Sequence, residues 1–491
     1  MRLKNFYKIV LLLIVTGFSV SCSNNGDQAP QLTVSVKTLS FEYEGGISEE
    51  ITIDANSTWT IANSGTSWLQ MSKASGGDGT TVTTITVLAN ETKLSRSVIL
   101  TVEADNGQAR RIIVTQLGKL YPSYNLSPKV PDATGMSSTA VQLAAKIQMG
   151  MGINIGNTME APTEAEWVTS KITESYIKFL KAKGFNAIRL PCTWISNHAS
   201  DPDKMKIDEA WLNRVKEVVG WCVANDMYVM VNIHGDGILS AETMDQAHKE
   251  VTNAKQKALW EQIATTLRDF DEHVIFAGAN EPPAENAEQM AILNSYYETF
   301  IKAVRATGGK NSYRVLVVQG PTTDPTKTFD LMNTMPTDKI PNKLMIEIHD
   351  YTPSLFTIIT DGDPTWGNMI YYWGAGNHST IEPERNATFG EEGAIDTEFQ
   401  NIKQKFVDKG IPVILGEYAV WRRKAPYNSN YLPKELDKHN KSVNDWTYYV
   451  TKQAKVNGIM PFYWETGFVL DRANNVVKDQ PIFDALVNAY K

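Results

Sequence analysis

The chain of 491 residues is long enough for about three domains of average size, although a single α/β barrel can itself occupy about 200 to 250 residues or more. Apolar residues make up 42% and charged residues 21%, which is ordinary globular usage and excludes a disordered polymer. The formal charge of −8, with no run of lysines or arginines, argues against nucleic acid or anionic lipid as the main partner. The high aromatic content, 10%, favours aromatic platforms in a groove that binds a neutral ligand.

The first 21 residues have the features of a secretion signal. Arg2, Lys4 and Lys8 precede an apolar stretch over residues 9–20, which runs into small residues. Twelve residues at about 1.5 Å each cannot cross a hydrocarbon layer about 30 Å thick, so a permanent transmembrane helix is disfavoured.

Residues 19–22, Ser-Val-Ser-Cys, resemble the lipobox of bacterial lipoproteins, in which the cysteine becomes the lipidated first residue of the mature chain. The resemblance implies an exported lipoprotein held in outer-membrane lipid through Cys22, on the cell surface or the periplasmic face, with residues 22–31 as a polar tether. An ordinary signal with an incidental cysteine is the alternative. Cys192 and Cys222 make neither a disulfide framework nor a zinc site by themselves, and we expect both to be buried.

Residues 32–118 predict a small all-β domain. Short runs of alternating apolar and polar residues are separated by turns rich in glycine and asparagine. This pattern predicts an antiparallel, immunoglobulin-like sandwich. Residues 119–135, with four prolines or glycines among polar residues, predict a linker.

The same segment resembles a BACON domain, an immunoglobulin-like module found ahead of catalytic domains in gut Bacteroidetes. The matching features are Trp59, Trp68-Leu69, the Asn90 turn, Arg96 ahead of a strand and the closing run 113–116. The resemblance implies that Trp59 or Trp68 stacks on a sugar. Alternatively both fill the core of a domain that acts as a spacer, which is the interpretation we prefer because tryptophan in a small sandwich is commonly buried.

Residues 136–491 have a different period. Eight strand-like apolar runs alternate with amphipathic helical patterns, and the runs cover residues 151–155, 187–190, 228–232, 274–277, 315–318, 344–348, 412–415 and 458–463. Gly184 and Gly410 each follow a lysine at a helix end, where a glycine commonly stops a helix. The sequence therefore predicts an α/β fold, a parallel (β/α)₈ TIM barrel preceded by the sandwich.

Polar and aromatic residues gather at the predicted carboxyl ends of these strands, where barrels of this fold carry their active sites. Two of them, Glu281 after the fourth strand and Glu417 after the seventh, are the carboxyl pair that acetal hydrolysis needs, one as acid and one as nucleophile. The other residues at the strand ends are Arg189, His234, Asn280, His349, Tyr351 and Trp464.

Taken in order, these pieces resemble glycoside hydrolase family 5, in the clan whose two catalytic glutamates are on strands four and seven. The matching motifs are Ile155-Gly156-Asn157-Thr158, residues 184–191, Ala279-Asn280-Glu281-Pro282, residues 347–353, Gly416-Glu417-Tyr418 and Tyr463-Trp464-Glu465. Each motif alone is weak, but all of them occur in the family's order. The endoglucanase and xyloglucanase group, its fourth subfamily, is the nearest in pattern.

The resemblance implies a role for each residue. Glu281 is the general acid/base and Glu417 the nucleophile, Asn280 holds the sugar 2-hydroxyl, and Trp464 supports a sugar ring. Arg189 and Tyr351 support Glu417, and His234 and His349 line the central subsite. Because the family retains anomeric configuration, the two carboxyls should lie about 5 to 5.5 Å apart. Many relatives have a second histidine after the one on strand three, whereas Gly235 and Asp236 follow His234 in this chain.

Other aromatic residues and histidines divide into two predicted groups. Trp194, Trp373 and Trp421 follow strands on the catalytic side and are candidate glucan subsites, as is Trp366. Tryptophans in helical stretches are expected to pack against the barrel, namely Trp167, Trp211, Trp221, Trp260 and Trp446. The histidines without motif context are expected on the solvated surface, namely His248, His273, His378 and His439.

The function that we predict is retaining, endo-acting cleavage of a β-1,4-glucan backbone in a plant polysaccharide such as xyloglucan, mixed-linkage glucan or cellulose, with no cofactor or metal. An endo-β-mannanase or glucomannanase is one alternative. A surface glycan-binding lipoprotein with an inactive barrel is another, although a binder has no use for a correctly spaced acid and nucleophile. A zinc hydrolase is a third, with poor motif support because no His-x-His occurs.

Overall fold

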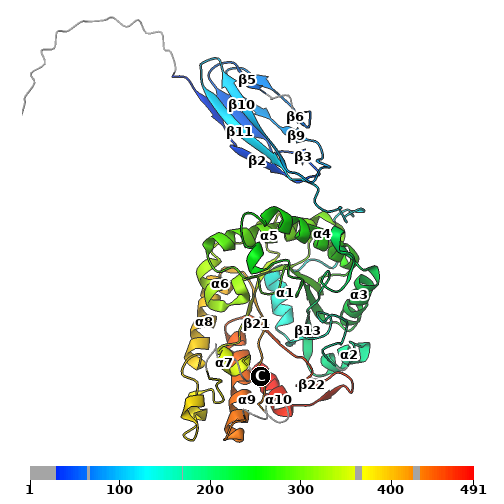
Figure 1. Ribbon diagram of the computed structural model, residues 1–491, viewed down its shortest axis with the longest axis vertical. Helices are drawn as coiled ribbons and strands as arrows, with labels where there is room; N and C mark the ends of the chain where they lie inside the picture. The colour runs from blue at the N-terminus through cyan, green and yellow to red at the C-terminus, as the bar shows by residue number, and fades with distance from the viewer. Residues whose placement is uncertain (1–28, 63–66, 169, 360–367, 424–431) are drawn as a thin grey trace, which may run out of the picture. The chain divides into compact units, whose positions relative to one another are not determined.

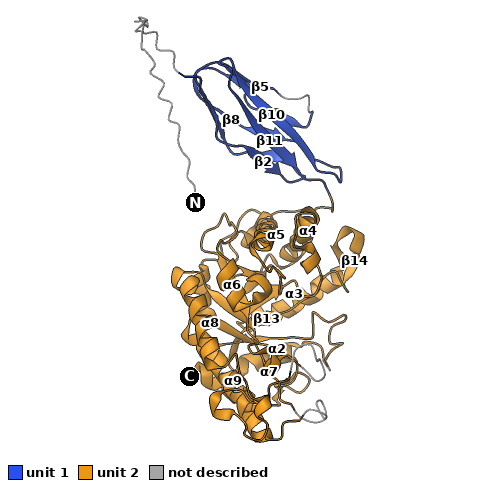
Figure 2. Cartoon of the chain, turned by 60° about the vertical axis from the view of Figure 1, so that its left-hand side comes forward, with its two compact units in different colours: residues 1–119 blue, residues 120–491 orange. Residues whose placement is uncertain are grey.

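The computed structural model describes residues 29–62, 67–168, 170–359, 368–423 and 432–491. The chain forms two compact units, residues 1–119 and residues 120–491, which Figure 2 colours separately. The predicted signal peptide, Cys22 and Trp366 lie outside the described residues. Within these ranges no helix combines the length and apolar character needed to cross a membrane.

The first unit is built from strands alone. Its strands are β1 (Leu32–Val34), β2 (Thr38–Phe41), β3 (Gly46–Ile47), β4 (Ile51–Ala55), β5 (Trp59–Ala62), β6 (Leu69–Met71), β7 (Ser75–Gly76), β8 (Gly79–Thr83), β9 (Ile85–Val87), β10 (Arg96–Ala104) and β11 (Ala109–Gln116). They form sheets in the orders β1-β4-β8, β2-β11-β10-β5-β7 and β3-β9-β6. All pairs are antiparallel except β2 with β11, so the predicted all-β domain is confirmed.

Alternation of side chains along these strands explains the core. Every second residue of β4 and β10 is buried, as expected for strands with one face on the core. Trp59 is 1% exposed and lies so close to Gly76 that a Cβ there would be 2.5 Å from the indole. The Arg96 guanidinium covers the half-buried ring of Trp68 at 4.5 Å. These positions agree with the core interpretation of Trp59 and leave it no face for a sugar.

The predicted linker differs from the structure, because residues 120–135 belong to the second unit. The buried carboxylate of Glu261 accepts hydrogen bonds from the backbone N–H groups of Tyr124 and Asn125. Lys129 pairs with the backbone at Gly308 and forms an ion pair with Asp269. The proline-rich composition predicts irregular backbone but carries no signal for these distant partners.

The second unit is a closed barrel of eight parallel strands, and Figure 1 shows helices around them. In order around the barrel they are β12 (Met151–Asn154), β13 (Phe185–Leu190), β16 (Tyr228–Asn232), β17 (Val274–Ala277), β18 (Leu316–Gln319), β19 (Leu344–His349), β20 (Val413–Glu417) and β21 (Ile459–Tyr463). Nearly all of their residues are buried, because helices cover the outer face and side chains fill the interior. The predicted TIM barrel is confirmed.

The helices of this unit lie around the strands. They are α1 (Ala140–Ile147), α2 (Glu174–Ala182), α3 (Glu209–Ala224), α4 (Lys249–Leu267), α5 (Ala287–Ala306), α6 (Pro325–Leu331), α7 (Ser354–Thr357), α8 (Glu392–Lys405), α9 (Leu436–Val456) and α10 (Gln480–Tyr490). Two hairpins accompany them, β14 (Ala199–Asp201) with β15 (Lys206–Ile207) and β22 (Leu470–Asp471) with β23 (Val476–Val477). Short 3₁₀ turns are at Pro202–Lys204, Ala241–Thr243, Gly309–Ser312, Pro321–Thr323, Ala375–Asn377, Pro383–Arg385 and Val407–Lys409.

Local sequence signals account for several boundaries. The Asp208 side chain caps α3 by accepting from backbone N–H groups of its first turn, and the Asn286 side chain caps α5 in the same way. Gly184 and Gly410 adopt φ of +94° and +79°, which confirms the predicted glycine stops. Cys192 and Cys222 are buried free thiols, as expected.

Helix α1 closes the amino end of the barrel. Its buried residues, among them Leu143 and Ile147, pack against inward-facing side chains of the strands, including Met230, Met345 and Ile414. Because α1 fills the amino end, the carboxyl end is the open end of the barrel. The sequence predicts the site at this end.

Candidate active site

Six strands bring the predicted residues to the carboxyl end of the barrel. Arg189 lies on β13, His349 and Glu417 are the last residues of β19 and β20, and the rest follow other strands closely. Direct contacts join Arg189, Asn280, Glu281, His349, Tyr351 and Glu417, whereas His234 and Trp464 contact one another through their rings. All eight residues therefore belong to one end of the fold, although four loops and three strands supply them.

Glu417 is held by two donors. The guanidinium Nη1 of Arg189 lies 2.7 Å from its Oε1, and the hydroxyl of Tyr351 donates to its Oε2 at 3.0 Å. Arg189 is fully buried and Glu417 is 5% exposed, so the ion pair is shielded from water. This arrangement fixes the orientation of the carboxylate and gives it a buried counter-charge.

Glu281 is more accessible than Glu417. Its side chain is 45% exposed, and its Oε1 lies 2.7 Å from Nδ1 of His349. Burial in the cleft raises its pKa, but the hydrogen bond and charge of His349, with the charge of Arg189, outweigh that effect and leave the pKa below the ordinary value. The Glu281 carboxyl is thus ionised at neutral pH, with the His349 imidazole beside it.

The two carboxyls lie close together. One carboxylate oxygen of Glu281, one of Glu417 and a ring nitrogen of His349 all lie within 4.8 Å of one another. That separation fits the short distance of about 5 to 5.5 Å expected for direct displacement, and it is too short for the intervening water of an inverting enzyme.

His349 carries a positive charge at neutral pH. Burial lowers its pKa, but the carboxylates of Glu417, Glu281 and Glu347 raise it to about 9. Both ring nitrogens face acids, Nδ1 toward Glu281 and Nε2 toward Glu347 at 3.2 Å. His234 differs, because burial and the charges of Arg189 and His349 hold its pKa well below the ordinary value, so that it is neutral.

Glu347 is a functional candidate that the sequence analysis missed. Its carboxylate is fully buried, with Oε1 2.7 Å from Nε of Arg189 and Oε2 accepting from the Gln319 amide at 2.6 Å. A Cβ at Gly416 would lie 2.0 Å from this carboxylate, so the neighbouring strand has room only for glycine. Its spacing from His349 is the signal that sequence inspection had available, since residues i and i+2 of a strand share a face.

Asn280 and Trp464 complete the centre. The Asn280 carbonyl oxygen accepts from Nη2 of Arg189 at 2.6 Å, which aims the amide nitrogen away from the guanidinium. The rings of His234 and Trp464 are nearly parallel, with centroids 5.9 Å apart. Gly156 allows this position of Trp464, because a Cβ there would lie 2.9 Å from the indole.

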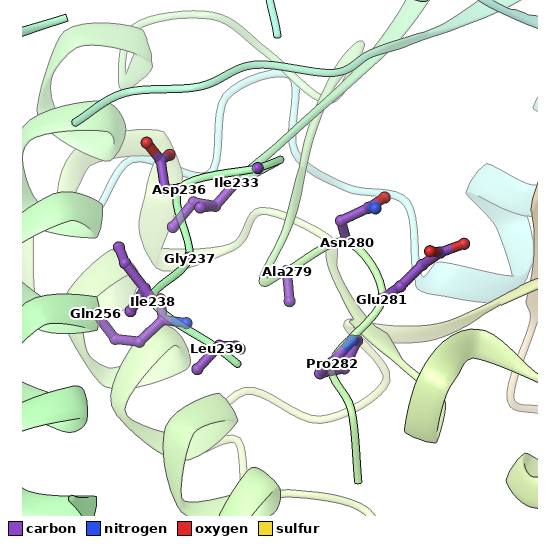
Figure 3. A pocket seen from close by; sticks show the side chains of 11 residues that line it. Ile233, Asp236, Gly237, Ile238, Leu239, Gln256, Ala279, Asn280, Glu281 and Pro282 are labelled. Carbon is purple, nitrogen blue, oxygen red and sulfur yellow. The ribbon is translucent and has the colours of Figure 1, made fainter. Parts of the chain in front are cut away.

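A cavity of about 310 Å³ opens beside Glu281. Figure 3 shows its two sides, residues 279–282 after β17 and residues 233–239 after β16. The unusual Asp236 does not act as a free carboxylate here, because it accepts hydrogen bonds from the backbone of Trp194, Ile195 and Ser196. It therefore holds the loop after β13 in place beside the cavity.

The predicted subsite tryptophans divide. Trp194 and Trp373 are buried, and their indole N–H groups donate to the backbone oxygens of Asn232 and Gly390. The prediction that Trp194 and Trp373 form glucan subsites is therefore wrong, because each side chain packs in the core beneath its loop. Trp421, 38% exposed, keeps an accessible face.

Two predictions for residues outside the site, His439 and Trp167, are also wrong. His439 is buried rather than solvated, with Nδ1 2.8 Å from the Tyr371 carbonyl oxygen and Nε2 accepting from the Arg423 N–H. Trp167 lies in a turn rather than a helix and is 55% exposed. Helical periodicity cannot identify either environment, because burial of α9 and exposure of the loop are set by distant segments.

A metal ion does not suit the three converging donors. Glu281, His349 and Glu417 are the set of histidine, cysteine or acidic side chains that approach closely enough among the described residues. Arg189 already neutralises Glu417, and His349 holds a proton on each ring nitrogen at neutral pH, so the centre offers a cation little net negative charge.

Two family models and several known proteins match this chain. Residues 149–468 match the family model of cellulase, glycosyl hydrolase family 5, and residues 56–117 match BACON, a putative N-terminal binding domain. A xyloglucan-specific endo-β-1,4-glucanase of Bacteroides ovatus is 33% identical over 481 residues, which cover 94% of this chain and 91% of that protein. Endoglucanase A of Paenibacillus barcinonensis is 32% identical and covers 74% of this chain and 92% of its own.

Solved structures give the same result. A Bacteroides ovatus family 5 xyloglucanase in complex with a XXXG heptasaccharide superposes with a TM-score of 0.68 and 31% identity, over 94% of this chain and 100% of the other. A broad-specificity endoglucanase from Ruminococcus champanellensis with bound cellotriose has a TM-score of 0.58 and 30% identity, over 71% of this chain and 98% of the other.

Proposed function

Since the chain belongs to the cellulase family, glycosyl hydrolase family 5, we propose that it is a retaining endo-β-1,4-glucanase acting by double displacement between Glu417 and Glu281. The observation that carries the proposal is the approach of the two carboxyls to within 4.8 Å, with Glu417 paired to the buried Arg189 at 2.7 Å.

In the first step Glu417 attacks the anomeric carbon while Glu281 protonates the departing glycosidic oxygen, so that the shortened chain leaves as an alcohol. In the second step Glu281 removes a proton from water, the hydroxide displaces Glu417 from the sugar, and the starting anomeric configuration returns. The net reaction consumes one water and one β-glycosidic bond, and both residues end in their initial state.

The proton for the first step comes from His349. The proton that Glu281 takes from water in the second step returns to His349 when the products leave, so that both side chains regain their starting protonation. The Nδ1–H of His349 points at Glu281 across 2.7 Å, and the raised pKa of about 9 keeps that proton present at neutral pH. A bound sugar excludes water and makes an ionised Glu281 more costly, which favours transfer of the proton to the carboxyl. Glu347 fixes the opposite ring nitrogen, so that Nδ1 is the atom that faces the acid.

Xyloglucan is the substrate that we propose first. The relative that covers almost the whole of this chain is named as xyloglucan-specific, and other solved relatives are named as broad-specificity endoglucanases. Side-by-side digestion of xyloglucan, mixed-linkage glucan, carboxymethylcellulose and glucomannan, with product analysis, tests this choice. Faster hydrolysis of a mannan backbone would replace it with the mannanase alternative.

Hydrolysis itself separates the remaining alternatives. An inactive glycan-binding lipoprotein binds these polymers and releases no reducing ends, whereas the proposed enzyme releases them from internal bonds and lowers viscosity early. Prior treatment with a chelator leaves the rate unchanged under the two-glutamate mechanism. If the chelator abolished activity and added zinc restored it, the protein would instead be a zinc-dependent hydrolase.

We also propose export as a lipoprotein anchored to the outer membrane through Cys22. The support is the signal-like segment and the Ser-Val-Ser-Cys sequence before a polar tether. Expression of the full chain in a bacterial host with labelled fatty acid tests it. The wild type should carry label and sediment with membranes, and Cys22→Ser should lose both properties. An unlabelled wild type would indicate an ordinary signal peptide with an incidental cysteine.

A further inference from the structure

Two buried amide side chains, those of Asn154 and Gln319, contact the Arg189–Glu347 ion pair from opposite sides of the barrel. Asn154 is the last residue of β12 and Gln319 the last residue of β18, and these strands are four places apart in the closed order of eight. All four side chains are 0% exposed. The interior of such a barrel is normally filled by apolar side chains, and burial of polar groups is costly, so this row of polar residues needs an explanation.

Asn154 connects Arg189 to the backbone that carries the nucleophile. Its Oδ1 accepts from Nη1 of Arg189 at 3.0 Å, and the same nitrogen lies 2.7 Å from Oε1 of Glu417. Its Nδ2 donates to the carbonyl oxygen of Gly416, the residue before Glu417, at 2.8 Å, and to that of Phe462 at 3.1 Å. One side chain therefore holds both the counter-ion of Glu417 and the peptide bond that joins Glu417 to its strand.

Gln319 makes the equivalent connection on the acid/base side. Its Nε2 donates to Oε2 of Glu347 at 2.6 Å, and its Oε1 accepts from the backbone N–H of Ala279 at 2.9 Å. Ala279 is two residues before Glu281, in the segment that Figure 3 shows beside the cavity. Gln319 thus fixes the beginning of the loop that carries Glu281. Glu347 in turn contacts the ring of His349, whose other nitrogen faces Glu281.

The chemistry of these contacts requires an amide at both positions. A guanidinium and a backbone N–H only donate hydrogen bonds, whereas a carboxylate and a carbonyl oxygen only accept them. Asn154 and Gln319 each contact one group of either kind, so the side chain must offer a donor and an acceptor without carrying charge. An apolar side chain or a carboxylate at either position would leave a buried partner without its hydrogen bond.

A comparable amide lies away from the catalytic end. Asn311 is 0% exposed, its Oδ1 accepts from Nε of the buried Arg314 at 2.7 Å, and its Nδ2 donates to the carbonyl oxygen of Ala264 at 2.7 Å. It lies in the 3₁₀ turn before β18, at the opposite end of that strand from Gln319. Asn311 therefore separates the stability that a buried amide gives from an effect on the catalytic carboxyls.

We propose that Asn154 and Gln319 are positioning residues, Asn154 for the nucleophile Glu417 and Gln319 for the acid/base Glu281. The inference rests on the proposed glucanase mechanism. Displacement of a reacting group by about 1 Å can cost about a hundredfold in rate. Loss of either amide therefore slows the step that its own carboxyl serves, and the two losses differ in their dependence on the leaving group.

The test first measures how fast and how completely Glu417 is trapped. The reagent is a dinitrophenyl cellotrioside fluorinated beside the anomeric carbon, whose leaving group departs without protonation. Mass spectrometry follows the covalent adduct in the wild type, Asn154→Asp and Gln319→Met. Asn154→Asp should label completely but about a hundredfold more slowly, because the nucleophile is displaced. Gln319→Met should label completely at nearly the wild-type rate, because this step does not need Glu281.

Hydrolysis of xyloglucan and carboxymethylcellulose then tests the acid/base side. Here the leaving group is a sugar, which requires protonation by Glu281. Asn154→Asp and Gln319→Met should both lower kcat/KM on these polymers by about a hundredfold. Gln319→Met thus loses rate only where the acid is needed. Partial unfolding does not give this pattern, since unfolded molecules reduce the extent of labelling and the rate of hydrolysis alike.

Asn311→Asp and Gln262→Met are the matched controls. Gln262, also a buried amide, accepts from the backbone N–H of Ile207 at 2.9 Å and donates to the carbonyl oxygen of Met205 at 2.8 Å, on helix α4. Both controls should keep the wild-type rates of trapping and hydrolysis below the unfolding transition, whatever they do to stability.

Wild-type rates in Asn154→Asp and Gln319→Met, or incomplete labelling that accounts for their whole loss, overturn the inference while the glucanase stands. Equal losses of trapping and hydrolysis in Gln319→Met overturn its assignment to the acid/base. If either variant does not fold, Asn154→Ser or Gln319→Asn, which are smaller and still polar, replaces it with the same expected pattern. A wild type that is neither labelled at Glu417 nor active on glucan overturns the proposed function instead.

Discussion

The two units of this protein bury different kinds of side chain. The core of the sandwich is apolar, and its few buried polar residues, Thr83, Asn90 and Gln116, are neutral. The carboxyl end of the barrel instead buries a cluster of charges around Arg189, Glu347 and His349. A buried ion cluster is weak evidence for stability, because desolvation offsets much of the attraction. The comparison therefore separates a region built for stability from one that keeps charge in place for chemistry.

The largest expected effect comes from removal of the proposed nucleophile. Glu417→Ala should lower kcat on xyloglucan by about 10⁴-fold or more, because no covalent intermediate can form. Added azide should restore partial turnover and yield a glycosyl azide of inverted configuration. Glu285→Ala, in an exposed ion pair with Lys327, is the matched control and should keep full activity. Near-normal hydrolysis by Glu417→Ala would refute the mechanism.

In the sandwich, the corresponding disruption changes stability and not rate. Trp59→Ala leaves a cavity in an apolar core and should lower the free energy of unfolding of that unit by about 3 to 5 kcal/mol. Thermal unfolding followed by calorimetry measures the loss, while hydrolysis of a soluble glucan at a temperature below the transition stays the same. A parallel loss of kcat would show that the barrel depends on the sandwich.

Substitution of the buried Glu347 tests whether this residue positions the site or only stabilises the fold. Glu347→Gln keeps the shape but removes the charge beside Arg189 and His349, so kcat should fall about ten- to a hundredfold. The pKa of His349 should fall as well, which NMR titration of the imidazole measures. Glu261→Gln, also buried but at the segment 123–125, is the control for a purely structural change. An unchanged pH profile would contradict a positioning role.

The smallest effect concerns pH. Because the pKa of His349 is raised to about 9 by its carboxylate neighbours, the stability that its charge contributes is complete below the ordinary pKa near 6.5 and is lost as pH rises through about 9. Denaturant unfolding at pH 6.5 and 9.5 should show this decrease in the barrel. His349→Gln should reduce the difference; an equal decrease in both proteins would assign it to other groups.

The sequence is most informative about the fold, because the spacing of apolar residues alone predicts the barrel strands. Eight buried runs predicted the barrel, because parallel strands covered on both faces leave few alternatives. Asn280, Glu281 and Glu417 were predicted because they follow such strands within recognisable motifs. The strand ends are therefore the feature of the sequence that predicts where the site lies.

Long-range contacts account for what was missed. Trp194 and Trp373 have loop sequences like those of accessible aromatics, but both pack in the hydrophobic core of the barrel, and their indoles donate to backbone oxygens 38 and 17 residues away. Glu347 lies within an apolar strand, and its partner Arg189 is four strands distant around the barrel. The i, i+2 spacing of Glu347 and His349 is the one local signal, and it does not reveal the pairing with Arg189.

The attachment of residues 120–135 to the barrel has a practical consequence for anyone who wishes to isolate the hydrolase. A fragment that begins at residue 136 would lack the groups of residues 123–125 that donate hydrogen bonds to Glu261. Its buried carboxylate would then have lost these partners. Trimming at Leu120 would spare them, at the boundary between the two units.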